Sequence, residues 1–240
     1  MTPAGESETD DDIVSKRERR LATKQQASAT EILDAAAKAF RRRGYSATSI
    51  DDVADILGCT KGRVYHYYRT KGDLFIGIHR RALVWALESV GPIAERTDLS
   101  ATARLQEMVR RHALHLMEHT DYMGPAQYHA EVNLAREGRS KDNSVHDIWE
   151  MRQRFESYFV SVIGAGMAAG EFRQGDPALI AKAVLGIANW MSVWFHAGLP
   201  SNTPEGRDLI ASEFSTFALR GVIKEDVTTS HRLSSSSSTA

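Results

Sequence analysis

Several side chains in one stretch of the sequence could hold a metal ion. His115, Glu118 and His119 follow the spacing H-x-x-E-H, and His112 lies one helical turn earlier. In a helix this spacing places His115 and His119 side by side, and the glutamate would then act as a general base. A hydrolase of this kind needs a further acidic ligand, which the sequence does not identify. A metal-dependent hydrolase and a non-catalytic metal site therefore stay as alternatives to histidines that face water.

A second group of residues could bind a nucleic acid. Lys61 and Arg63 can donate hydrogen bonds to guanine, and Gly62 between them allows the helix backbone to approach closely. Hydroxyl, imidazole and ammonium groups around them suit phosphate oxygens. We expect base contacts from 61–63 and phosphate contacts from six flanking residues: Thr48, Ser49, Thr60, Tyr65, His66 and Lys71. The alternative interpretation makes Tyr65 a core aromatic residue and Lys71 a solvated lysine.

The distribution of charge agrees with a polyanionic partner. The 240-residue chain has a net charge of -1, yet residues 13–81 contain 15 of the 30 Lys and Arg and only 7 of the 31 Asp and Glu. This third of the chain therefore carries an excess of positive charge, although solvated basic helix faces give the same pattern. A flexible arm before the first expected helix could follow the minor groove or merely aid solubility. Its basic residues are Lys16, Arg17, Arg19, Arg20 and Lys24.

The apolar residues recur at helical spacing almost throughout, which predicts an all-α protein. Three pairs of residues have the spacing of a capping box and mark expected helix starts: Ser28 with Glu31, Ser49 with Asp52, and Thr70 with Asp73. Gly44 and Gly58 end the first two of these helices. A short third helix, capped by Thr60, covers 61–67, so a helix-turn-helix spans 49–68.

These segments resemble the TetR family of repressors. The matching residues are Ala35–Phe40, Gly44–Ile50, Val53 with Ala54, Gly58, Lys61–Tyr68 and Lys71–Phe75. The resemblance implies an N-terminal three-helix DNA-binding domain over 26–86 and a C-terminal helical ligand-binding and dimerisation domain over 87–225. It also implies a homodimer that binds double-stranded operator DNA and is released by a small-molecule effector. An activator, or a regulator that senses no ligand, remains an alternative.

The C-terminal part contains most of the large aromatic residues. The resemblance implies an effector cavity there, and dimerisation through the last two helices, about 177–197 and 204–223. Met151–His196 resembles, more weakly, the regulators of lipid or steroid catabolism that respond to acyl-CoA thioesters, so we expect an apolar or acyl-type effector. The candidate ligand-binding residues are Tyr122, Tyr128, Trp149, Arg152, Tyr158, Trp190 and Trp194.

Other classes of protein find little support in the sequence. Cys59 is the only cysteine, so no intramolecular disulfide can form. We find no nucleophile triad and no phosphate-binding glycine loop, and we expect no enzyme activity, no metal and no cofactor. With no apolar run of about 18 residues, we expect a cytoplasmic protein without a membrane partner. The tails, 1–25 with acidic then basic residues and 226–240 with a serine run, are expected to be disordered.

Overall fold

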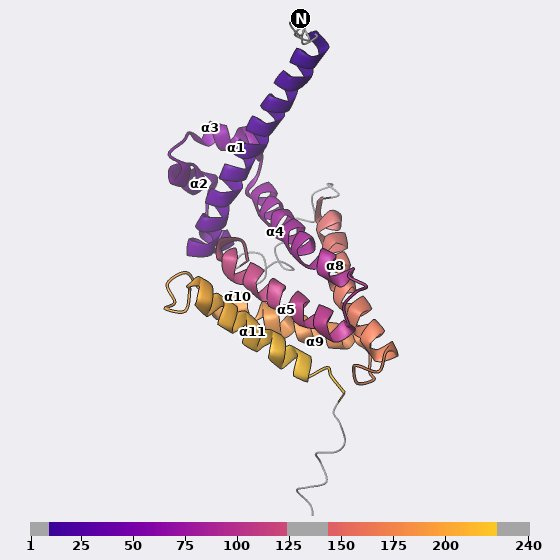
Figure 1. Ribbon diagram of the computed structural model, residues 1–240. Coiled ribbons are helices and arrows are strands. Elements are labelled where there is room, and N and C mark those ends of the chain that lie inside the picture. The colour runs from indigo at the N-terminus through magenta and orange to yellow at the C-terminus, as the bar shows by residue number, and fades with distance from the viewer. Residues whose placement is uncertain (1–9, 124–143, 225–240) are drawn as a thin grey trace, which may run out of the picture. The chain divides into compact units, whose positions relative to one another are not determined.

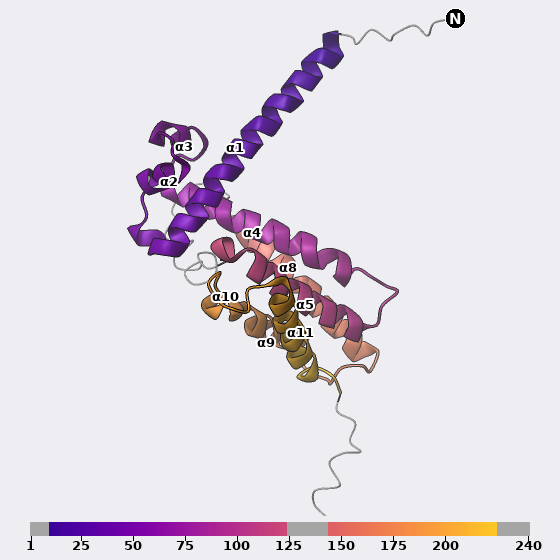
Figure 2. The same cartoon turned by 60° about the vertical axis from the view of Figure 1, so that its left-hand side comes forward.

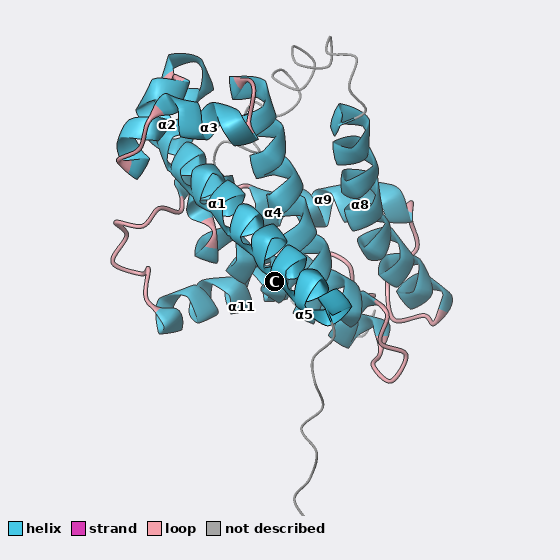
Figure 3. Cartoon of the chain, turned by 90° about the horizontal axis from the view of Figure 1, so that it is seen from above, coloured by secondary structure: helices cyan, strands magenta, loops and turns pink. Residues whose placement is uncertain are grey.

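A computed structural model describes residues 10–123 and 144–224 of the chain. The described residues form helices, one isolated β-bridge between Phe172 and Ile223, and no β-strand (Figure 3). This confirms the prediction of an all-α protein. The chain divides between Ile78 and His79 into two compact units, which are described separately below.

The first unit is a small helical domain. It contains α1 (Asp10–Ala47), α2 (Ile50–Leu57), α3 (Lys61–Tyr67) and the first residues of α4 (Lys71–Ala94). Helix α2 packs against both α1 and α3 (Figure 2). Phe40 and Phe75 are buried and form an aromatic cluster with Tyr45, whose ring centre lies 4.8 Å from that of Phe75. Because this cluster joins α1 to α4, it fixes the two ends of the segment that contains α2 and α3.

Local capping explains where the short helices begin and end. The Ser49 hydroxyl accepts a hydrogen bond from the Asp52 amide at 3.1 Å, and the Asp52 carboxylate accepts one from the Ser49 amide at 2.8 Å. Thr70 and Asp73 form the same reciprocal pair at the start of α4. Gly58 takes the left-handed conformation, with φ 61°, directly after α2. These caps and this turn were predicted from the sequence.

The prediction for the first helix was wrong at its start. Ser28 lies inside α1, which runs from Asp10 without interruption as far as Gly44, so residues 10–25 are helical where a disordered arm was expected. The segment contains Lys16, Arg17, Arg19, Arg20 and Lys24. Lys and Arg favour helix, which allows α1 to extend past the predicted cap. At the other end, Gly44 has φ 77° and interrupts α1 where the sequence placed the end of the helix.

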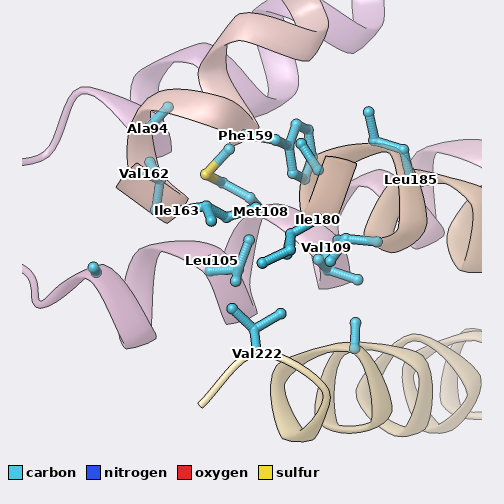
Figure 4. Packing of buried hydrophobic residues seen from close by; sticks show 14 of the residues in the cluster. Ala94, Leu105, Met108, Val109, Phe159, Val162, Ile163, Ile180, Leu185 and Val222 are labelled. Carbon is cyan, nitrogen blue, oxygen red and sulfur yellow. The ribbon is translucent and has the colours of Figure 1, made fainter. Parts of the chain in front are cut away.

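The second unit continues α4 from His79 and adds five helices among the described residues (Figure 1). These are α5 (Ala101–Glu118), α8 (Ser144–Ala168), α9 (Pro177–Asn189), α10 (Met191–Trp194) and α11 (Pro204–Arg220). Helix α5 packs against α8, α9 and α11. Its buried Leu105 and Met108 meet Phe159 and Ile163 of α8 in the core (Figure 4). The core therefore centres on α5.

The starts of α9 and α11, and the breaks at Gly170 and at 198–204, occur where the sequence predicts them. Asp176 and Thr203 accept hydrogen bonds from the first-turn amides of α9 and α11, as their position before a proline predicted. The Gly-Pro pairs at 91–92 and 124–125 also predict breaks between helices. The first break is absent, because Pro92 lies in the last turn of α4, which ends at Ala94. The predicted domain boundary at 86/87 also falls inside α4. The expected break at Gly124-Pro125 lies outside the described residues.

Candidate nucleic-acid interface and ligand cavity

Helix α3 exposes one face to solvent. Lys61 and Tyr65 lie one turn apart on it, and Gly62 and His66 lie beside them; all four are exposed. Val64 points the other way and is fully buried. A Cβ atom on Gly62 would meet only the Thr60 hydroxyl, at 3.8 Å, so packing inside the protein does not require glycine there. The exposed face thus combines a cation, an imidazole, a phenol and an uncovered stretch of backbone.

Arg63, the third predicted base-contacting residue, is held by an acid from another helix. Its guanidinium donates to the Glu31 carboxylate of α1 at 2.6 Å, and its side chain is 39% exposed. The hydrogen bond to Glu31 raises the pKa of the guanidinium, which stays charged. The ion pair is at the surface, where such pairs contribute little stability, so Arg63 can exchange Glu31 for another acceptor at small cost.

The two hydroxyl groups at the starts of α2 and α3 differ in what they bind. The Ser49 hydroxyl is part of the capping box with Asp52. Thr60 occupies the N-cap position of α3, yet its side chain makes no capping hydrogen bond. Thr60 is exposed, so its hydroxyl remains accessible to an outside acceptor.

Thr48 and Lys71 are placed differently from the exposed phosphate contacts that the sequence predicted. Thr48 is buried and donates its hydroxyl to the backbone carbonyls of Gly44, at 2.8 Å, and Ala39, at 3.3 Å. A hydroxyl has one proton to donate, so none is left for a phosphate. Thr48 therefore closes the end of α1 from inside the domain.

Lys71 is likewise engaged inside the first unit, and it is not the solvated lysine of the alternative interpretation. Its ammonium donates to the backbone carbonyls of Tyr45 at 2.9 Å, Ser46 at 3.3 Å and Thr48 at 2.9 Å. It also lies 4.6 Å from the centre of the Tyr45 ring. An ammonium has three protons, and these three carbonyls can take all of them. Lys71 binds the start of α4 to the end of α1.

Glu31 and Tyr45 are the residues of this interface that sequence reasoning missed. Glu31 was assigned to a cap at Ser28, and it binds Arg63. Tyr45 was treated only as part of a motif, and it lies under Lys71 and against Phe75. Only the opposite charges of Glu31 and Arg63 hinted at a pairing, since nothing in the spacing of residues 32 positions apart signals a contact.

The second unit contains a cavity of about 620 Å³, within the range of sites that hold a drug-sized ligand. Three helices contribute apolar residues to its walls. These residues include Ala82, Leu83 and Ala86 of α4, Phe155 of α8 and Leu185 of α9. Its polar lining residues are His79, His112, His115, Arg152, Glu156, Lys182, Asn189 and Ser192. The cavity thus combines apolar walls with a substantial set of polar side chains.

Two of the predicted ligand-binding residues line this cavity, Arg152 and Trp190. Four others are described but lie elsewhere. Tyr122 is buried against Trp85, Trp149 is exposed beside the Arg152 guanidinium, Tyr158 lines a separate groove, and Trp194 packs on Phe214. Tyr128 lies outside the described residues. Helical spacing could not tell which aromatic residues face a cavity and which fill the core.

The two histidines within the second half of α5, His112 and His115, are not solvated, contrary to the interpretation favoured from the sequence. His112 and His115 are buried and line the cavity, and His119 stacks on Trp85 at 4.3 Å. Burial lowers the pKa of His112 to about 4, although a hydrogen bond to Asn189 acts in the opposite direction. Burial, aided by neighbouring charges, lowers the pKa of His115 to about 3. Both imidazoles are therefore neutral at neutral pH. No group of three or more metal-ligating residues occurs in the described parts of the chain.

Large apolar side chains gather at the surface of the last helices. Leu179 of α9, Trp190 and Val193 around α10, and Leu209 and Phe217 of α11 are between 40% and 67% exposed. Pro177–Trp194 is also long and apolar enough, by length and composition, to cross a membrane, which corrects the expectation that no such run exists. Core and interface helices of soluble proteins have the same composition, so this is weak evidence for a span.

A short basic helix held in a helix-turn-helix, followed by a second helical unit, is the arrangement of a DNA-binding transcriptional regulator. Family models agree. Residues 32–78 match the model of bacterial regulatory proteins of the tetR family, and residues 98–222 match the tetracyclin repressor-like C-terminal domain. The chain belongs to the TetR family of transcriptional regulators, which are not enzymes. This confirms the family predicted from the sequence and removes support for a hydrolase.

Individual relatives cover most of the chain. The transcriptional repressor KstR2 of Mycobacterium tuberculosis is 24% identical over 201 residues, which are 82% of this chain and 94% of that protein. A tetR-family regulator from Rhodococcus RHA1 superposes with a TM-score of 0.70 at 26% identity, covering 83% of this chain and 98% of that one. AibR, solved in complex with isovaleryl coenzyme A and operator DNA, superposes with a TM-score of 0.61 at 19% identity, covering 78% and 97%.

The contacts of Lys71 predict a structural effect of its removal. Lys71→Met keeps the apolar stem but loses the three hydrogen bonds to α1, and we expect it to lower the free energy of unfolding by about 1–2 kcal/mol. Urea unfolding would measure this loss, with the exposed Lys38→Met as the control. If Lys71 instead bound phosphate, its removal would leave stability unchanged and reduce the salt dependence of DNA binding by about one phosphate contact.

The buried histidines predict a loss of stability in acid. Their pKa values are lowered on folding, so the unfolded chain binds more protons below about pH 6.5, the ordinary histidine pKa. Their contribution is therefore complete above about pH 6.5 and is lost as the pH falls towards about 4. In melts over this range, His115→Phe should lose less stability than the wild type. The exposed His146→Gln is the control, and equal acid sensitivity in all three proteins would contradict the prediction.

Proposed function

We propose that the protein is a repressor that binds double-stranded operator DNA as a homodimer and is released by an apolar or acyl-type effector. The observation that carries the proposal is the exposed face of α3 with Lys61, Gly62, Tyr65 and His66, in the part of the chain that carries the excess positive charge. Two relatives support it by analogy: KstR2 is named a repressor, and AibR was solved with an acyl-CoA and operator DNA.

The DNA contacts fall into two groups. Lys61 and Arg63 offer donors to base edges in the major groove, and Gly62 leaves room for the backbone to approach. Tyr65, His66, Thr60 and the edge of α2 at Ser49 lie around them and suit phosphate oxygens. Arg63 would either break its ion pair with Glu31 in order to reach the DNA, or keep the pair so that the guanidinium is already oriented when the DNA binds.

The cavity of the second unit would hold the effector. Its apolar walls suit an acyl chain or a ring system, and Lys182 and Arg152 add cations for an anionic end. Four residues of its lining belong to α4, the helix whose first residue, Lys71, binds the end of α1. An effector that prefers one position of α4 would shift the population of DNA-binding states and relieve repression.

A homodimer would cover the apolar surface of α9, α10 and α11. Leu179, Leu209 and Phe217 are each more than 60% exposed, an unusual amount of apolar surface for a free monomer. A dimer also suits DNA, because two recognition helices can bind two half-sites about one helical turn apart. Because operator DNA lies in the cytoplasm of a bacterium, we assign the protein to that compartment.

An activator would use the same α3, so that alternative differs only in the effect of binding on transcription. A regulator that senses no ligand is less well supported, because the chain contains a cavity of ligand size with polar groups in its lining.

DNA binding is tested by fluorescence anisotropy with the DNA upstream of the protein's own gene and a scrambled duplex, at two salt concentrations. Lys61→Ala should lose about 1–3 kcal/mol of binding free energy and much of its sequence preference. Lys224→Ala, which removes the same charge from the second unit, should bind as the wild type does. Equal affinity of the wild type for both duplexes would argue against this operator, and no binding to any DNA would refute the proposal.

Dimer formation is tested by light scattering after chromatography. Leu209→Glu and Phe217→Glu place a charge in the proposed interface and should give monomers that bind operator about 100-fold more weakly, since the two half-sites are no longer held together. Val84→Glu, at a 36% exposed position of α4, is the control. If the interface variants remain dimers with full operator affinity, the interface lies elsewhere.

A further inference from the structure

Two ring nitrogens lack a partner in the described part of the chain, each on a histidine that lines the cavity. His112 Nδ1 and His115 Nε2 are buried and make no hydrogen bond to any described residue. Both side chains line the cavity, and His112 and His115 are only 4% and 3% exposed. A buried polar atom without a partner is costly, which makes such atoms unusual in a folded protein unless a ligand or water completes them.

The partners of the other two ring nitrogens fix where the protons lie. His112 Nε2 is 2.9 Å from Asn189 Oδ1, an oxygen that only accepts, so Nε2 is the donor. The Ala82 carbonyl accepts a hydrogen bond from His115, and Nδ1 must be its donor because Nε2 makes none. In a neutral imidazole the remaining nitrogen carries a lone pair. His112 Nδ1 and His115 Nε2 are therefore both hydrogen-bond acceptors.

The charged groups around the cavity lie among other residues of its lining. Lys182 and Glu156 pair with one another, and both remain partly exposed. Arg152 lies 5.0 Å from the Trp149 ring. His79 lines the cavity as a third buried imidazole with contacts of its own. The apolar walls run between these groups, so a bound molecule must bring an apolar body as well as a group for the two histidines.

We propose that His112 and His115 form an effector subsite for an uncharged hydrogen-bond donor, a hydroxyl or amide N–H, carried on an apolar body. A carboxylate, a phosphate or a ketone would bring its own lone pairs against those of the imidazoles. Protonating the histidines to accept such a group would place a charge in a buried site. A metal ion would also bind lone pairs, but the described residues supply no third ligand. The proposal rests on the proposed function and names the chemistry of its effector.

The test uses three probes of similar shape: para-propylphenol, which donates a hydrogen bond; para-propyltoluene, which has no polar group; and para-propylbenzaldehyde, which only accepts. Titration calorimetry with the full chain should give an affinity about tenfold higher for the phenol than for either comparison probe. In His115→Phe this preference should fall to about twofold or less. His119→Phe, a change on the same helix outside the cavity lining, should keep it.

Nitrogen-15 spectra of the wild-type protein labelled at histidine provide a readout that needs no variant. The signals of His112 Nδ1 and His115 Nε2 should move when the phenol is added and stay in place with the toluene. Equal affinity for all three probes, binding of none, or unmoved histidine signals would overturn the subsite. Stoichiometric zinc in the purified protein would overturn it as well.

The same titrations with operator DNA present separate this inference from the proposed function. If the phenol binds with the expected preference but does not change DNA affinity, the subsite stands and the effector part of the proposed function fails. If the protein binds its operator selectively and the phenol shows no preference, the function stands and the subsite fails.

Discussion

A helix of seven residues does not hold its shape alone in water, and α3 is such a helix. The first unit supplies what α3 lacks. Val64 of α3 is buried, and Arg63 binds Glu31 of α1. Tyr68, the first residue after α3, donates a hydrogen bond to the Ala29 carbonyl of α1. Lys71 then fastens the following helix to the end of α1. The other side of α3 supplies the packing, so the solvent-facing side chains can be polar and exposed.

The same arrangement places Lys61 and Lys71 in different environments. Lys61 is 67% exposed and 3.8 Å from Asp51, a loose surface pair, so its ammonium is available to a base. The Lys71 ammonium is instead taken up by three carbonyls. A motif that contains both lysines does not distinguish them. The distinction arises because the chain turns at Gly44 and brings the carbonyls of Tyr45, Ser46 and Thr48 close to the start of α4.

The sequence predicts a structural feature correctly where neighbouring residues in the chain determine it. The capping pairs at Ser49 and Thr70, the left-handed Gly58 and the helical spacing all act within a few residues, and the all-α fold follows from them. Prediction from the sequence fails where the partner is distant. Lys71 appeared to be a phosphate contact because its carbonyl partners, 23–26 residues away, are brought near only by tertiary folding. Thr48 has a partner as near as Gly44, but its burial could not be seen in the motif. The capping signal at Ser28 did not mark a helix start, because strong helix formers precede Ser28 and α1 continues through it.

The histidines of α5 present the same limit in the second unit. Their spacing placed His115 and His119 together, and the structure agrees, with ring centres 4.8 Å apart. Whether such rings bind metal, face water or line a cavity depends on what packs against them. Asn189 of α9 and the Ala82 carbonyl of α4 each occupy one nitrogen of a cavity-lining histidine. They thereby fix the tautomers of two residues that line the cavity, so the hydrogen-bonding chemistry of these histidines is set by residues far away in the sequence.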